Sequence, residues 1–140
     1  MNPRLILPLL LLTLLFPASA FAELDVSDAR IKHLPPTVPV RAGYMTLRNP
    51  GAQAVTIVAV QSDAFASVEI HRSYMQDGMM RMDPVDSLTI EPGETLQLAP
   101  GGLHLMMMQP AEATRPGDSI EIVLEFDDGT EQRLTLEVVK

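Results

Sequence analysis

The chain has 140 residues, neither cysteine nor tryptophan, and a formal net charge of −8 at pH 7. This acidity argues against binding to nucleic acid or to an anionic membrane surface, because both repel a negative protein. Without cysteine, a blue-copper electron-transfer centre is excluded, since it requires a thiolate ligand, and we expect no lipoprotein-type anchor.

The N-terminal segment is typical of a secretory signal peptide. A short positive start precedes an apolar run over residues 5–16, and small residues follow in an A-x-A arrangement. We expect residues 1–22 to be a cleaved signal peptide, with cleavage after Ala22 or, as second choice, after Ala20; a retained N-terminal anchor is the alternative. Residues 23–140 would then form one periplasmic domain.

The remainder of the chain predicts an all-β domain. Short alternating or β-branched segments are separated by Gly, Pro, Asn and Asp, and no segment shows a sustained 3.6-residue period. This pattern predicts a Greek-key β-sandwich. The candidate strands are 25–32, 43–49, 54–61, 67–74, 79–83, 87–91, 94–99, 103–108, 118–126 and 131–138.

Alternation along two of these segments identifies core-facing positions. In the segment 118–126, apolar and polar residues alternate, and in 94–99 two leucines face one way. The predicted core residues of these strands are Ile120, Ile122, Leu124, Phe126, Leu96 and Leu98.

Four soft metal ligands stand at fixed spacings in the second half of the chain. His71, Met82, His104 and Met106 read H-x10-M-x21-H-x-M, and seven of the nine methionines lie in 75–82 and 106–108. Two imidazoles and two thioethers suit Cu(I), whereas zinc prefers thiolate, imidazole or carboxylate and calcium and magnesium prefer oxygen. The pattern therefore predicts a Cu(I) site made by these four side chains.

Strand periodicity determines whether these ligands meet. Side chains alternate along a strand, so His104 and Met106 share one face. A two-residue loop Asp77-Gly78 would pair Ser73 with Met82 and leave His71 diagonal to Met82, whereas a loop one residue earlier would pair His71 with Met82 directly. Either register brings the ligands to one face, but a three-residue loop without a bulge would separate them.

Purely structural roles remain as alternatives. Methionines 106–108 could fill gaps in the core, because methionine packs irregular spaces well. Met75, Met80 and Met108 have the right parity to be further ligands or an access route for the metal, although hydrophobic shielding is the simpler role. The third histidine, His33, is interpreted as an ordinary surface or hydrogen-bonded residue.

The segment VEIHRSYMQDGMMRMDPVDSLTIEPGETLQLAPGGLHLMMM resembles the core of the periplasmic PCu(A)C-type copper chaperones, whose motif is H-(M)-x10-M-x21-H-x-M. The resemblance extends to AGYMTLRNPG and to the closing strands. It implies a cupredoxin-like β-sandwich that binds one Cu(I) through His71, Met82, His104 and Met106. The optional methionine after the first histidine is Arg72 here. Because the His/Met-rich C-terminal tail of some relatives is absent, we expect no second, Cu(II) site.

The resulting hypothesis is a periplasmic Cu(I) carrier rather than an enzyme. The resemblance implies delivery to a protein acceptor for assembly of the CuA centre of cytochrome c oxidase, the acceptor being the CuA-bearing subunit or another copper chaperone. One alternative is copper sequestration for tolerance through the same site. Another is an exported β-sandwich interaction module whose methionines only pack.

Overall fold

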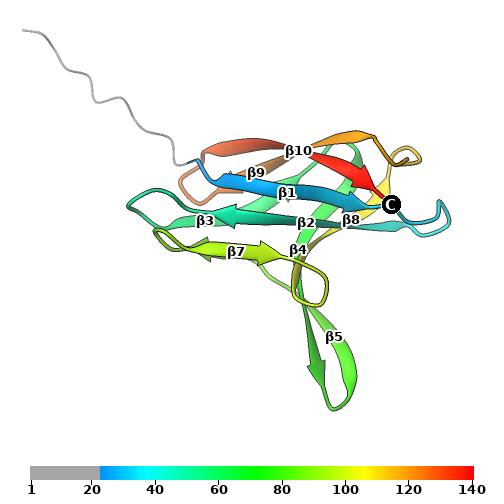
Figure 1. Cartoon of the computed structure of the whole chain (residues 1–140), viewed down its shortest axis with the longest axis horizontal. Helices are drawn as coiled ribbons and strands as arrows, with labels where there is room; N and C mark the ends of the chain where they lie inside the picture. The colour runs from blue at the N-terminus through cyan, green and yellow to red at the C-terminus, as the bar shows by residue number, and fades with distance from the viewer. Residues whose placement is uncertain (1–22) are drawn as a thin grey trace, which may run out of the picture.

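The computed structural model describes residues 23–140, which form ten β-strands and no helix (Figure 1). The predicted signal peptide, residues 1–22, lies outside the described residues. Within 23–140, no helix is long and apolar enough to cross a membrane. The strands are β1 (Asp25–Lys32), β2 (Val40–Arg48), β3 (Val55–Gln61), β4 (Phe65–Gln76), β5 (Met79–Pro84), β6 (Leu88–Ile90), β7 (Thr95–Leu98), β8 (Leu103–Pro110), β9 (Ser119–Phe126) and β10 (Glu131–Val139).

Seven strands close into a barrel-like sheet. The pairing order is β5-β4-β8-β2-β1-β10-β9-β3-β6, and a further contact between β3 and β4, at Val60 and Val68, joins the strands β4 through β3 into a ring. β5, β6 and β7 pair with β4, β3 and β2 outside this ring. All pairings are antiparallel except the one between β1 and β10. The all-β prediction is confirmed.

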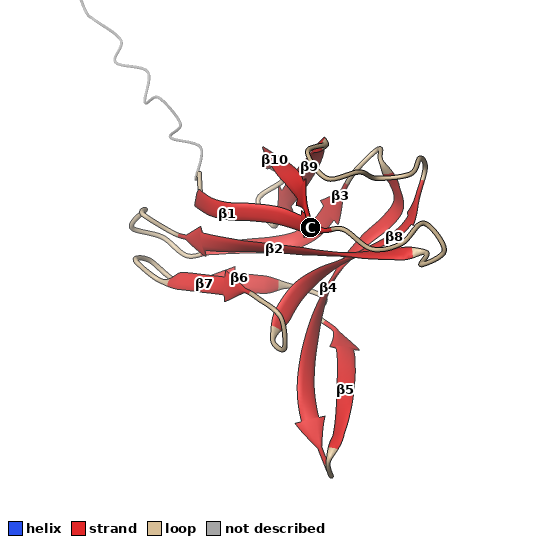
Figure 2. Ribbon diagram, turned by 45° about the vertical axis from the view of Figure 1, so that its right-hand side comes forward, coloured by secondary structure: helices blue, strands red, loops and turns tan. Residues whose placement is uncertain are grey.

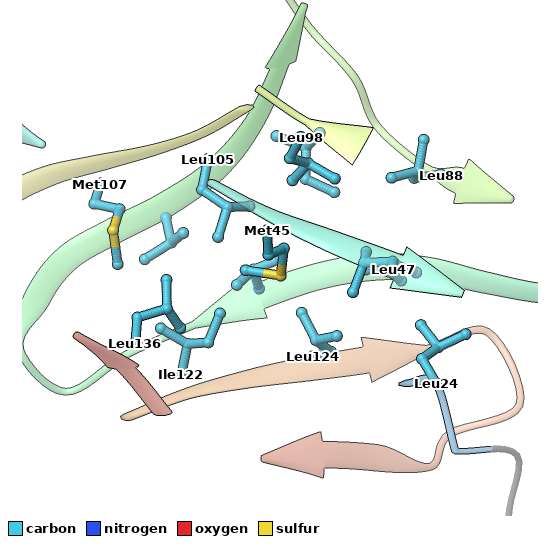
Figure 3. Packing of buried hydrophobic residues seen from close by; sticks show 14 of the residues in the cluster. Leu24, Met45, Leu47, Leu88, Leu98, Leu105, Met107, Ile122, Leu124 and Leu136 are labelled. Carbon is cyan, nitrogen blue, oxygen red and sulfur yellow. The ribbon is translucent and has the colours of Figure 1, made fainter. Parts of the chain in front are cut away.

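The interior of the ring is the hydrophobic core (Figure 3). The alternation predicted for β9 is confirmed, since its four predicted core residues, Ile120, Ile122, Leu124 and Phe126, are all buried. On β8, Leu105 and Met107 point inward and are 1% and 0% exposed. Leu98 is buried as predicted, whereas Leu96 is partly buried and packs against the core. The barrel wall therefore has an apolar inner face, which lines the core, and an outer face.

All ten predicted strands are present, but five of them, β2, β4, β5, β8 and β10, are longer than predicted. β2 begins at Val40, not at residue 43, because Val40 and the two residues after it pair with Met108, Met107 and Met106 of β8. That partner is about 65 residues away in sequence, so local turn residues give no sign of it. β4 runs to Gln76 and so continues beyond the barrel.

The end of β4 and all of β5 form a hairpin that projects from the barrel (Figures 1 and 2). We call residues 73–84 the arm. Its turn is Asp77-Gly78, with φ angles of 52° and 75°. Positive φ at both central residues defines the type I′ turn that Asp-Gly favours, and this turn matches the twist of the flanking strands. The two-residue loop is confirmed, and it pairs Ser73 with Met82.

Candidate metal centre

The two histidines of the predicted site lie directly opposite each other on adjacent strands. His71 of β4 pairs with His104 of β8, and their ring centroids are 6.1 Å apart with the ring planes at 44°. With metal–imidazole bonds of about 2 Å, rings at this separation are close enough for one ion to join them. The pairing of β4 with β8 thus brings together two residues that are 33 positions apart in sequence.

His71 lies, with Arg72, in the short stretch of β4 that is bordered by both β8 and β5. It faces His104 on one side and Pro84 on the other. Met106 is opposite Glu69, two pairs further along β8, and Met82 is opposite Ser73, two pairs further along β5. Since directly paired residues share a face and parity repeats every two residues, all four predicted ligands lie on one face.

This shared face is the outer face of the barrel wall. The intervening residues of β4 and β8, such as Ile70, Leu105 and Met107, point into the core. Met107 is therefore a core residue, as the packing interpretation held, whereas Met106 and Met108 are half-buried on the outer face. Exposure rises from the barrel to the arm, from 7% for His104 to 45% for Met82.

Hydrogen bonds define which nitrogen each histidine can offer. Nδ1 of His104 is 3.0 Å from the carbonyl oxygen of Gly102. A carbonyl only accepts, so this nitrogen donates its hydrogen and Nε2 keeps a free lone pair. Nε2 of His71 is 2.7 Å from Oε2 of Glu69. With an ionised carboxylate as acceptor, the free lone pair of His71 is on Nδ1, which is buried without a hydrogen-bond partner among residues 23–140.

Glu69 and Gly102 are functional candidates that the sequence interpretation missed. Each accepts a hydrogen bond from one ring nitrogen of a predicted ligand and leaves the other nitrogen free, which is the usual arrangement around metal-binding histidines. The signal for Glu69 was present, because a residue two positions before His71 must share its face. Gly102 acts through its backbone carbonyl, so its residue type carries no such signal.

Thioethers stand beside the two histidines on this face. Among residues 23–140, no group of three or more His, Cys, Asp or Glu side chains is arranged to hold a metal ion. The methionines add thioether ligands to this face, and thioethers favour Cu(I).

The opposite face of the arm has a different chemistry. Arg72 pairs with Asp83 and Tyr74 with Arg81 across β4 and β5. The Tyr74 hydroxyl donates to Oδ2 of Asp83 at 2.9 Å, and this hydrogen bond, with a smaller contribution from the negative charge of Asp83, raises the pKa of Tyr74. Polar cross-strand contacts therefore occupy most of this face, and Met79, opposite Gln76, is its one methionine.

The chain belongs to the LpqE-like family, described as "Putative lipoprotein LpqE-like", which matches residues 24–138. It is 32% identical over 90 residues to the "Putative lipoprotein Lxx21020" of Leifsonia xyli subsp. xyli (strain CTCB07), over 64% of this chain and 54% of the relative. It is 30% identical over 98 residues to the protein RP573 of Rickettsia prowazekii (strain Madrid E), over 69% of this chain and 54% of that protein. The chain therefore matches about half the length of these relatives.

Solved structures share the fold. The copper-bound PCuAC domain from PmoF2 superposes with a TM-score of 0.69 at 19% identity, over 83% of this chain and 92% of that domain. Apo-DR1885 from Deinococcus radiodurans gives a TM-score of 0.67 at 26% identity, over 100% and 95% of the two chains. Its Cu(I) form, CuI-DR1885, gives 0.63 at 29% identity, over 88% and 83%. The cupredoxin-like fold implied by the sequence resemblance is confirmed.

Proposed function

We propose that this protein is a copper chaperone that binds one Cu(I) through His71, Met82, His104 and Met106. The observation that carries the proposal is the direct pairing of His71 with His104, with ring centroids 6.1 Å apart, on the face shared with both methionines. The likeness to CuI-DR1885, at 29% identity, supports copper as the ion and Cu(I) as its oxidation state.

The proposed ligands are all neutral when bound. Two imidazoles and two thioethers leave the charge of the ion at +1, and softness favours Cu(I) over Cu(II). The hydrogen bonds of His104 and His71 hold the rings so that Nε2 and Nδ1, respectively, remain free to bind. Because neutral ligands can be exchanged one at a time, this ligand set suits a carrier that must release its cargo, and the proposal is a carrier and not an enzyme.

Delivery to a protein acceptor is the second part of the proposal. Assembly of the CuA centre of cytochrome c oxidase is the acceptor role that the sequence resemblance implies. Sequestration for copper tolerance uses the same site and differs in the fate of the ion. Mixing the Cu(I)-loaded protein with an apo CuA domain separates the two: transfer with appearance of the CuA spectrum after oxidation supports delivery, and retention supports sequestration.

The binding proposal is tested by titrating the purified protein with Cu(I), under reductant, against a chromophoric competitor. One tight equivalent is expected, with strong weakening in Met82→Ala and in Met106→Ala. Met79→Ala is the matched control, because Met79 is 60% exposed on the same arm but on its other face. If the wild type does not compete for Cu(I), the proposal is wrong and an exported interaction module with packing methionines becomes the better explanation.

Export to the periplasm is also proposed, from the signal-peptide pattern of residues 1–22. Intact-mass measurement of the protein recovered from the periplasmic fraction should give the mass of residues 23–140. A mass that includes the first 22 residues would contradict cleavage, and recovery in the cytoplasmic fraction would contradict export.

A further inference from the structure

The arm carries four exposed methionines outside the core, and three of them, Met75, Met80 and Met82, are on the same face. Met75, Met80 and Met82 are 62%, 59% and 45% exposed, and the core cluster of the described residues includes none of them. All six residues of β5 are exposed. Large apolar side chains gathered on an exposed surface contribute little to stability, and such gatherings usually mark an interaction site.

These three methionines share one face of the arm. Met75 pairs directly with Met80, and Met82 pairs with Ser73, the residue two before Met75. This is also the face of His71, because parity repeats every two residues along β4. We call Ser73, Met75, Met80 and Met82 the sulfur face. Met79 lies on the other face, opposite Gln76, although it is equally exposed.

The cross-strand geometry allows three sulfur atoms to converge. Directly opposite residues have Cβ atoms about 4.5–5.5 Å apart, and diagonal neighbours such as Met75 and Met82 are about 7–8 Å apart at the backbone. Methionine is unbranched with three rotatable side-chain bonds, so its sulfur can move toward a common point. Ser73, the remaining member of the face, is small and leaves room between them.

We propose that Met75, Met80 and Met82 form an outer Cu(I) site through which the ion enters and leaves the inner site of His71, Met82, His104 and Met106. The inference rests on the proposed function, and Met82 belongs to both sites. Three neutral thioethers match the softness of Cu(I) and offer nothing to harder cations. The outer site is exposed on the arm, while the inner site includes the 7% exposed His104.

The transfer step is a ligand exchange. Bonds from copper to Met80 and Met75 form as bonds from copper to His71, His104 and Met106 break, while the bond to Met82 persists. Copper remains Cu(I) throughout, and no proton or electron moves. An acceptor would then meet the ion on the projecting arm, without having to reach the barrel wall.

The test follows the methionine methyl groups by NMR during Cu(I) titration of protein labelled with ¹³C at those methyls; Cu(I) is diamagnetic. Up to one equivalent, the methyls of Met82 and Met106 should shift. Beyond one equivalent, those of Met75 and Met80 should also shift, and that of Met79 should not. If Met75 and Met80 never shift, the outer site is wrong and the inner site stands. If the methyl signal of Met79 shifts as much as those of Met75 and Met80, the binding is unselective and the proposed outer site is wrong. If no methyl shifts, the proposed function fails as well.

A kinetic experiment gives a second, independent readout. In the double variant Met75→Leu/Met80→Leu, which keeps apolar bulk and removes sulfur, the affinity of the inner site should be unchanged. Release of Cu(I) to bathocuproine disulfonate should slow by about tenfold, because the outer ligands no longer lower the barrier for exchange. Met79→Leu is the matched control and should release copper at the wild-type rate. An unchanged release rate in the double variant would overturn the relay.

Discussion

Three of the four predicted ligands belong to the barrel wall, and the fourth belongs to the arm, which is a different kind of structure. His71, His104 and Met106 belong to strands of the closed ring, where β8 is paired on both sides and His104 is 7% exposed. Met82 belongs to β5, which pairs only with β4 and whose residues are all exposed. A buried or partly buried half on the barrel wall and an exposed half on the arm therefore meet at His71.

This difference indicates how a carrier can bind Cu(I) tightly and still release the ion. Histidine positions in the wall are held by tertiary pairing and by hydrogen bonds, so they keep their geometry without metal. The arm depends on one turn and a few cross-strand pairs, and elements with few buried contacts open at low free-energy cost. We expect the ligands of the barrel wall to determine most of the Cu(I) affinity and the arm to determine how fast Cu(I) is exchanged.

Removing an imidazole from the wall should have the largest effect. His104→Ala should weaken Cu(I) binding by about 10³-fold, which corresponds to about 4 kcal/mol. The control is His33→Ala, since His33 lies outside this face and should leave affinity unchanged. Competition titration measures both, and similar losses in the two variants would mean that the histidines act through stability.

The contribution of the arm to Cu(I) affinity should depend on which face a methionine occupies, and not on the number of sulfur atoms. Met82→Ala should lower Cu(I) affinity by about 10²-fold, or about 2.7 kcal/mol. Adding Ser73→Met to that variant should restore part of the affinity, because Ser73 is directly opposite Met82 on the same face. Adding Arg81→Met instead should restore nothing, because Arg81 faces the other way. Rescue by Arg81→Met would contradict the predicted ligand geometry.

Glu69 should matter as a positioning residue for His71. Glu69→Gln removes the charged acceptor of the His71 Nε2 hydrogen and should lower Cu(I) affinity by about tenfold, as is usual when such a partner is lost. The ¹⁵N shifts of the apo-protein should show His71 losing its preference for the Nε2–H tautomer. Glu131→Gln, an exposed carboxylate on β10, controls for the change in net charge. Unchanged tautomer and affinity would exclude this role.

The turn of the arm should have a smaller effect. Gly78 has φ of 75°, a conformation that costs a residue with Cβ about 1–2 kcal/mol. Gly78→Ala should therefore loosen the arm, seen as faster amide exchange there, and lower Cu(I) affinity a few-fold. Gly93 has φ of 74° in a turn away from the arm, so Gly93→Ala should cost similar stability with no change in affinity. Equal losses of Cu(I) affinity in both variants would mean that Gly78→Ala acts by destabilising the whole domain and not the arm.

The smallest effect should come from the polar face of the arm. Asp83→Asn should lower the pKa of Tyr74 toward that of a free tyrosine, measured by the ultraviolet absorbance of tyrosinate, because the charged acceptor is removed. Because the pKa of Tyr74 is raised in the folded state, the hydrogen bond stabilises the arm below pH ~10. This stabilisation is lost as the pH rises through the folded-state pKa. Copper affinity at neutral pH should not change. A loss of affinity would show that this face also shapes the site.

Much of the local structure could be predicted from sequence. Alternating or β-branched segments between turn residues located all ten strands. The Asp77-Gly78 pair indicated a tight turn and left two registers open, of which the structure has the one that pairs Ser73 with Met82. These features are short-range, since a turn fixes its own hairpin and strand parity repeats every two residues. The common face of His104 and Met106 was determined in the same way.

Long-range pairing was decided by the tertiary structure alone. Nothing local indicates that β4 pairs with β8, that β2 extends back to Val40 beside Met108, or that His71 is bordered on both sides. Those neighbours follow from closing the barrel around one core, in which every strand must find a partner for its backbone groups. The sequence by itself determined which residues could be ligands and which face each occupies within its own strand, and only the closed barrel brought His71 to His104, because strand neighbours depend on the whole core.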